Sequence, residues 1–284
     1  MRILLKLIIV LLLLVGAVAA VFYQVYFKTG QYVHEGALAS PPSESIDDEN
    51  WVSIFDGNTL DGWIPKLVGS NLGEDSKNTF RVQDGSITVA YDEYPQWSGE
   101  FGHLFYHLPF TRYVLQLEYR FVGEQIAEGA AMAWAWRNSG VMIHSQAPES
   151  MALTQDFPVS LEVQLLGAHP DEHRPTANLC TPGTHVELHG KRHTQHCMFS
   201  TSPSFVGDEW ITLEVEVRGD DVVRHFVNSE LAFEYSKPHL DTWMGPGKQL
   251  AADGSEEEIR GGYIALQSES HPVQFRNIKI APLD

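Results

Sequence analysis

Basic residues are scarce in this chain, which carries 19 lysines and arginines against 37 aspartates and glutamates, for a formal net charge of -18. A chain this acidic repels phosphate backbones, and the sequence contains no basic stripe and no nucleic-acid-binding motif. We therefore expect no nucleic-acid partner. The acidity itself favours solubility and indicates no particular ligand.

Cysteine is also rare. Cys180 and Cys197 are the only two cysteines, and they lie 17 positions apart with no C-x-x-C pair. In an exported domain this pattern favours one disulfide, which in the chain-entropy model stabilises the folded state by roughly 3 kcal/mol. A metal site is the alternative, because the same stretch holds several histidines. These are His185, His189, His193 and His196.

Charge is absent from the run between Leu7 and Tyr23, which follows a short basic start. Its 17 residues would form a helix of about 25 Å, slightly shorter than the roughly 30 Å core of a bilayer. Aromatic residues extend the segment, so we expect residues 7–27 to anchor the chain in a membrane and the rest to lie on the periplasmic or extracellular face. Ala17 and Ala19 are small residues at the spacing of a cleavage site, so a removed signal peptide is the alternative.

The chain divides into three regions on this basis. Residues 1–27 are the signal anchor or signal peptide. Residues 28–50 combine proline, serine and acidic residues, which cannot build a core, and we interpret them as a polar linker. Residues 51–284 form the folded domain, which is long enough to bury one substantial core.

Apolar and polar residues alternate through this domain, and no long helical pattern follows the N-terminal segment. The clearest alternating runs are residues 113–121, 161–165 and 210–218. Alternation of this kind is typical of strands with one buried face, and turn sequences such as Asp84-Gly85 separate the runs. We predict an all-β, two-sheet antiparallel sandwich of the jelly-roll type.

Three local patterns resemble one known family. The domain opens with an aromatic-Asp-Gly strand and Leu-Asp-Gly-Trp within residues 51–63. Its middle contains Asn-Ser-Gly at 138–140 and Glu-Val-Gln at 162–164. It closes with Gly-Tyr-Ile-Ala-Leu-Gln at 262–267 and Val-Gln-Phe-Arg-Asn-Ile at 273–278. Together they resemble the 3-keto-disaccharide hydrolase family, also described as 3-keto-glucoside 1,2-lyases and hydratases, over nearly the whole domain.

The resemblance implies a concanavalin-like sandwich that acts on sugars already oxidised to a ketone at C3. It also implies an upstream sugar 3-dehydrogenase as a functional partner. Two departures concern the substrate more than the fold. His144 stands where the family more often carries arginine, and the segment 169–202 is expanded.

The implied chemistry needs a base for the C2 proton, an acid for the departing C1 oxygen, and a donor or cation for the enolate. Glu162 is the first candidate for the base or for a metal ligand, and His144 is the second catalytic candidate. A divalent cation held by Glu162 with His144 or a loop histidine would stabilise an enolate, but no compact ligand motif supports one. No cofactor is therefore assigned.

Substrate-binding candidates come from the same alternation. Glu118, Arg120 and Gln164 occupy even-numbered positions whose odd-numbered neighbours are apolar, and we expect them to converge with the catalytic pair in one sugar-sized hollow. Asn138 suits a sugar hydroxyl, although it also fits a turn. Trp63 suits stacking on a sugar ring, although it also fits the core.

Three other functions compete with catalysis on 3-keto sugars. A non-catalytic, lectin-like module would need the aromatic and amide residues but no acid and base. A structural envelope domain also agrees with an anchor and a linker. A retaining glucanase is disfavoured, because residues 212–216 lack the middle aspartate of the required Glu-x-Asp-x-Glu strand.

Overall fold

The computed structural model describes residues 50–127, 130–169 and 172–284. The predicted membrane anchor at 7–27 and nearly all of the predicted linker lie outside these ranges. Within them, no helix combines the length and the apolar character that crossing a bilayer requires.

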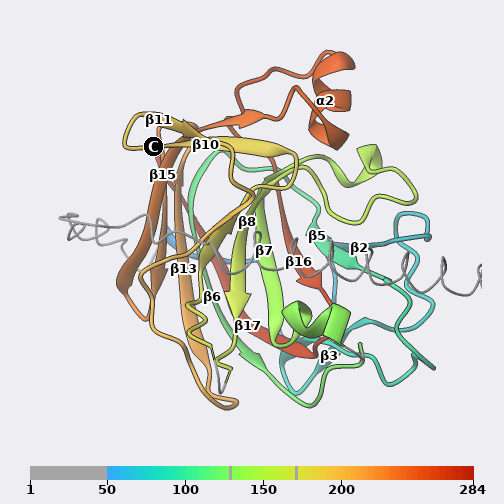
Figure 1. The fold of residues 1–284 in the computed structure, drawn as a ribbon. Helices are drawn as coiled ribbons and strands as arrows, with labels where there is room; N and C mark the ends of the chain where they lie inside the picture. The colour runs from blue at the N-terminus through green and yellow to red at the C-terminus, as the bar shows by residue number, and fades with distance from the viewer. Residues whose placement is uncertain (1–49, 128–129, 170–171) are drawn as a thin grey trace, which may run out of the picture.

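Two antiparallel sheets form the domain, as the alternation predicts (Figure 1). The larger sheet has ten strands. In spatial order they are β11 (Lys191–His193), β10 (Thr184–Leu188), β15 (Glu230–Leu240), β14 (Val222–Val227), β13 (Ile211–Arg218), β6 (Arg112–Phe121), β17 (Val273–Pro282), β4 (Ser86–Val89) and β3 (Phe80–Gln83), with β1 (Val52–Ser53) paired to β17.

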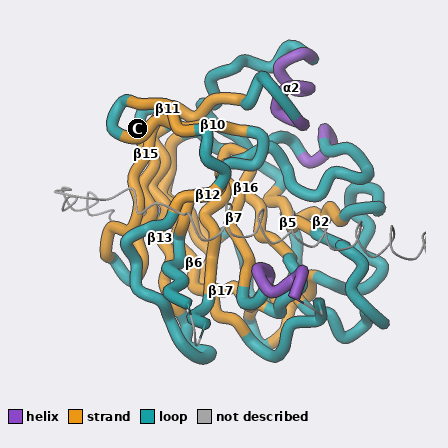
Figure 2. The backbone as a smooth tube through the Cα atoms, in the orientation of Figure 1, coloured by secondary structure: helices purple, strands orange, loops and turns teal. Residues whose placement is uncertain are grey.

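The smaller sheet has seven strands and carries the candidate site. In spatial order they are β12 (Cys197–Met198), β9 (Asn178–Cys180), β8 (Leu161–Leu166), β7 (Asn138–Ser145), β16 (Tyr263–Ser268), β5 (Gly102–Tyr106) and β2 (Trp63–Leu67). Helical structure in the described ranges is sparse, as Figure 2 shows. It includes the short helices η3 (Ala130–Ala135), η4 (Pro148–Ser150) and α2 (Gly245–Ala252).

The core lies between the two sheets and is built from alternate residues of each strand. Leu115 and Leu117 of β6 and Val163 and Leu165 of β8 are completely buried in the same apolar cluster. Burying one such side chain contributes roughly 1.5–3 kcal/mol, so the period-two pattern largely determines which face of each strand turns inward.

The polar faces of the two sheets consequently point away from each other. Glu118 and Arg120 belong to β6 in the larger sheet, whereas Glu162 and Gln164 belong to β8 in the smaller one. The prediction that these four side chains converge in one hollow is therefore wrong. Alternation shows which side of a strand faces outward, but it does not show which sheet the strand joins.

The two cysteines form the predicted disulfide. Cys180 of β9 lies directly opposite Cys197 of β12, with a Cα–Cα distance of 4.1 Å. Between them the chain leaves the smaller sheet, contributes β10 and β11 to the edge of the larger one, and returns. The disulfide joins the strand where this excursion begins to the strand where it ends, beside the candidate site.

Candidate functional site

A pocket of about 260 Å³ opens on the outer face of the seven-stranded sheet. The strands supply its floor, while η3 and the loops around residues 157, 182 and 196 supply its walls. Its lining residues are Trp134, Asn138, Phe157, Glu162, Gln164, Cys180, Pro182, His196, Cys197 and Glu269. Small-molecule sites typically occupy roughly 300–1,000 Å³, so this pocket suits one small ring rather than an extended ligand.

Gly140 provides the space for the Glu162 carboxylate. On β7 and β8, Gly140 lies opposite Gln164 and Met142 lies opposite Glu162. A Cβ atom at position 140 would come within 2.6 Å of Glu162 Oε1. The carboxylate therefore lies over this glycine, which explains why the Asn-Ser-Gly pattern ends in a residue without a side chain.

Two buried carboxyl groups share the pocket. Glu162 is 6% exposed, and burial raises its pKa to about 8, although the nearby Gln267 amide acts in the opposite direction. Glu269 is 3% exposed. Burial and the charge of Glu162 raise the pKa of Glu269 well above its ordinary value, against the opposing effect of Arg174. Two neighbouring buried carboxyls resist simultaneous ionisation, so the pair retains a proton near neutral pH and can supply both an acid and a base.

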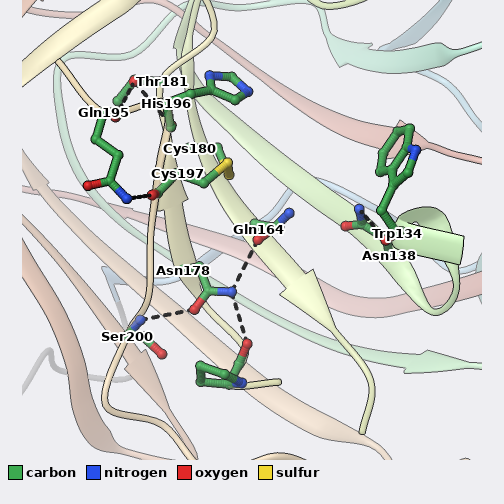
Figure 3. Close-up of a disulfide and its surroundings, with 11 residues drawn as sticks. Trp134, Asn138, Gln164, Asn178, Cys180, Thr181, Gln195, His196, Cys197 and Ser200 are labelled. Atoms are coloured by element: carbon green, nitrogen blue, oxygen red, sulfur yellow. Dashed lines mark hydrogen bonds between the residues drawn. A yellow bond between two sulfur atoms is a disulfide. The ribbon is translucent and has the colours of Figure 1, made fainter. Parts of the chain in front are cut away.

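Amide groups form the polar part of the floor (Figure 3). Gln164 Oε1 accepts a hydrogen bond of 3.1 Å from Asn178 Nδ2, and Asn178 Oδ1 accepts one of 2.9 Å from the backbone of Ser200. Asn138 Nδ2 donates to the Trp134 carbonyl at 3.4 Å, whereas its buried Oδ1 has no partner among the described residues. Asn138 therefore retains an acceptor for a ligand hydroxyl.

Aromatic side chains form one wall of the pocket. The rings of Trp134 and Phe157 both pack on Phe101, with centroid distances of 6.3 and 5.0 Å. Figure 3 shows the Trp134 indole across the pocket from His196, with Gln164 and Asn138 drawn between them. An indole over amide groups is a suitable surface for the apolar face of a sugar ring.

His144 does not join Glu162, contrary to the prediction. Its backbone has a φ of 50°, and the pairing register shifts between Tyr263 and Ala265 on the adjacent strand β16. The imidazole Nε2 lies 2.9 Å from the carbonyl oxygen of Gly219, in the β13–β14 turn of the other sheet. His144 lines a separate pocket instead. A left-handed residue breaks the strict alternation on which the face assignment depended.

Three other candidates also lie away from this pocket. Trp63 is a core residue whose Nε1 donates a hydrogen bond of 2.8 Å to the Ile54 carbonyl, which corrects its prediction as a stacking surface. On the larger sheet, Glu118 accepts hydrogen bonds from Arg276 and Asn277, and Arg120 bonds to Gln274. Glu162, Gln164 and Asn138 are the predicted site residues that the structure brings together.

Glu162 and His144 are not brought together as metal ligands, because they line different pockets, whereas the loop histidine His196 lines the same pocket as Glu162. The parts of the chain that the structure describes contain no group of three or more histidine, cysteine, aspartate or glutamate side chains placed to hold a metal ion.

Sequence reasoning missed Glu269, although the signal for it exists. Ala265 and Gln267 alternate with the core residues Ile264 and Leu266 in β16. Continuing the same alternation by two residues places Glu269 on the outer face, beside the pocket. Trp134 and Phe157 had no such signal, because they reach the pocket from a short helix and a loop without periodicity.

Comparison with known proteins gives one family. A family model described as a 3-keto-alpha-glucoside-1,2-lyase-like domain matches residues 50–281. Among proteins with curated functions, none matches this sequence.

Several solved structures are similar to the chain. A protein of Parabacteroides distasonis, provisionally named a glycosyl hydrolase, is 18% identical with a TM-score of 0.46, covering 83% of this chain and 95% of that one. A carbohydrate-binding module from Bacillus subtilis is 9% identical with a TM-score of 0.43, covering 78% and 95%. LamAcat from Zobellia galactanivorans is 10% identical with a TM-score of 0.45, covering 77% and 90%.

Proposed function

The chain belongs to the 3-keto-alpha-glucoside-1,2-lyase-like family, and on that premise we propose that it cleaves 3-keto-glycosides by elimination followed by hydration. The observation that carries the proposal is the pair of buried carboxyl groups, Glu162 and Glu269, in a pocket sized for one ring. Such a pair supplies the base and the acid that the elimination requires.

The reaction begins at the carbon next to the ketone. A carbonyl at C3 acidifies the proton on C2. The ionised form of Glu162, whose share increases as the pH approaches 8, removes this proton and leaves an enolate whose charge is on the C3 oxygen. When the enolate collapses, the C3 ketone re-forms, a C1–C2 double bond appears and the C1–oxygen bond breaks. Burial and the charge of Glu162 favour the protonated form of Glu269, so Glu269 is the group that protonates the departing oxygen. Water then adds to C1 and C2, and the net reaction is hydrolysis.

The lining of the pocket supports a neutral sugar as the substrate. Among the described residues that line it, the ionisable groups include two carboxyls but no lysine or arginine, and this lining suits an uncharged ligand better than a phosphate or a carboxylate. Asn138 and Gln164 present amide groups to hydroxyls, and Trp134 presents a ring face. The pocket accommodates the oxidised ring, and the leaving group extends toward solvent.

A direct test compares a 3-keto disaccharide with its unoxidised parent. The full chain is expected to cleave the keto sugar alone. Glu162→Gln is expected to abolish turnover while the protein stays folded, because an amide cannot take the C2 proton. The matched control is Glu118→Gln on the outer face of the other sheet, which should retain full activity. Full activity in the Glu162 variant would remove this residue from the mechanism.

The lectin-like alternative shares the aromatic and amide contacts but makes no use of the carboxyl pair. Binding of the parent sugar, with no turnover of either compound, would favour that alternative. Isothermal titration with the parent disaccharide, run beside the activity assay, separates the two functions.

We also propose that the domain acts outside the cytoplasm, held at the membrane by residues 7–27 and supplied by a sugar 3-dehydrogenase. The apolar N-terminal run and the presence of a disulfide support this arrangement. Protease digestion of spheroplasts, whose outer layers are removed, compared with fully lysed cells, tests it. Degradation of the domain only after rupture of the cytoplasmic membrane would contradict the proposal.

A further inference from the structure

Two buried polar side chains beside the pocket have no hydrogen-bond partner. Both ring nitrogens of His103 and both amide atoms of Gln267 are unpaired among the described residues, and each residue is 0% exposed. Buried donors and acceptors without partners are costly and uncommon in folded proteins. Four such atoms on two neighbouring side chains therefore suggest a function that requires them.

Both side chains lie on the sheet face that carries Glu162. His103 of β5 is directly opposite Gln267 of β16, so the two point to the same side. Their neighbours Leu104 and Leu266 point into the core, which leaves His103 and Gln267 on the outer face. Adjacent strands lie about 4.8 Å apart, so the two side chains form one polar row across neighbouring strands.

This row leads toward the Glu162 carboxylate. Gly140 is the residue of β7 over which that carboxylate lies, and β7 separates β8 from β16. The Gln267 amide interacts with the Glu162 carboxyl and lowers its pKa, although no hydrogen bond of normal geometry joins the two side chains. A base, an amide and an imidazole thus follow one another across the outer face of neighbouring strands.

Phe157 lies between His103 and the pocket. Its ring packs edge-on against the imidazole, with a centroid distance of 6.0 Å, and the same side chain lines the pocket. Phe157 is only partly buried. Contact between a ligand in the pocket and His103 therefore requires the Phe157 side chain to move aside.

We propose that His103 and Gln267 form an oxyanion site that donates hydrogen bonds to the C3 oxygen of the substrate as the enolate develops. This inference rests on the proposed function, and it names the groups that stabilise the charge. On a six-membered ring the C3 oxygen projects from the carbon next to C2. A base at C2 and donors at the C3 oxygen must therefore lie side by side, as Glu162 and this polar row do.

The electrostatics of His103 suit this role. Burial, with a smaller effect from Lys66, lowers the pKa of His103 to about 3, so the ring is neutral at physiological pH. A neutral imidazole donates one N–H and cannot neutralise Glu162 as a cation would. The Lys66 ammonium is itself occupied, because it donates to the carbonyl oxygens of Leu67 and Ser70 at 3.1 and 2.9 Å.

The test isolates proton removal from bond cleavage. A 3-keto sugar with hydrogen in place of the C1 leaving group can form the enolate but cannot eliminate, so exchange of its C2 proton in D₂O, followed by NMR, measures enolate formation alone. His103→Leu and Gln267→Leu are each expected to lower the exchange rate about 10²–10³-fold, the loss typical of one oxyanion donor. His103→Gln, which keeps an N–H donor, should recover part of the rate.

Stability measurements distinguish this role from a structural one. Because His103 makes no hydrogen bond, His103→Leu should leave the thermal midpoint unchanged or raise it. His225 is the matched control. It is equally buried, but its ring nitrogens lie 3.0 Å from the Ala177 carbonyl oxygen and 3.2 Å from the Tyr235 hydroxyl. His225→Leu should lower the midpoint and leave the exchange rate of the folded protein unchanged.

Different results would overturn the proposed function and the oxyanion site. A wild-type protein that neither exchanges the C2 proton nor cleaves a 3-keto glycoside overturns the proposed function, and the oxyanion site with it. An active wild-type protein whose His103→Leu and Gln267→Leu variants remain folded and exchange within twofold of its rate overturns the oxyanion site alone.

Discussion

Replacing Glu162 by glutamine is expected to stabilise the folded protein at neutral pH while it removes activity. The reason is that burial raises the pKa of Glu162 from 4.5 to about 8. Above about pH 4.5 the unfolded chain releases this proton, which lowers the free energy of the unfolded state. The folded chain retains the proton and is not stabilised in this way. A folded-state pKa that is raised therefore means stability that is present at low pH and lost as the pH rises toward 8. Glutamine has the shape of the protonated acid and carries no such penalty.

The magnitude follows from the two pKa values. One unit corresponds to about 1.36 kcal/mol, so the free energy of unfolding of the wild type, relative to the variant, should fall by about 3 kcal/mol between about pH 5 and about pH 7.5. Glu162→Gln is also expected to stabilise the folded protein through Glu269, because removing the charge of Glu162 relieves the repulsion that raises the pKa of Glu269.

Urea unfolding followed by tryptophan fluorescence measures this difference, since the chain contains 7 tryptophans. Wild type and Glu162→Gln are compared at both pH values, with unchanged denaturant slopes as the check that the same transition is observed. Glu118→Gln provides the control, because it removes a carboxylate on the outer face of the other sheet. Its effect should be about 0–1 kcal/mol and similar at both pH values. A difference between wild type and Glu162→Gln that does not change with pH would show that Glu162 is not protonated in the folded protein over this range, and the raised pKa on which this prediction rests would be refuted.

Three further predictions concern the glycine beside Glu162, the disulfide and the outer face of the larger sheet. Gly140→Ala is expected to destabilise the fold by about 1–3 kcal/mol and to reduce turnover, because its Cβ atom would lie 2.6 Å from Glu162 Oε1; equal stability and activity in denaturation and kinetic assays would contradict this packing. Replacing Cys180 and Cys197 together by serine should lower stability by roughly 3 kcal/mol, measured by urea unfolding, and make the protein insensitive to reductant. Glu118→Gln should leave KM for a 3-keto glycoside unchanged, since its side chain lies on the opposite outer surface; a several-fold rise would place substrate on the larger sheet.

The local sequence pattern was sufficient to predict the sandwich, the inward face of its strands and the disulfide. Alternation is a direct consequence of burying one side of a strand, so Leu115 and Val163 could be assigned to the core from their neighbours alone. The disulfide needed no choice between partners, because the chain has only two cysteines. The opening, middle and closing motifs indicated the family because each motif lies within one short segment and can be recognised without knowledge of the tertiary structure.

The pairing of strands that are distant in the sequence decided which side chains meet in the pocket. The strands carrying Glu118 and Glu162 have the same alternation, yet one joins the larger sheet and the other the smaller, so their carboxylates lie on opposite surfaces. A left-handed residue at His144 turned its ring toward the other sheet. Glu269 reached Glu162 from a segment more than a hundred residues away. Periodicity shows which face of each strand packs against the core. Which distant side chains come together depends on strand order and register, and only the assembled sheets determine these.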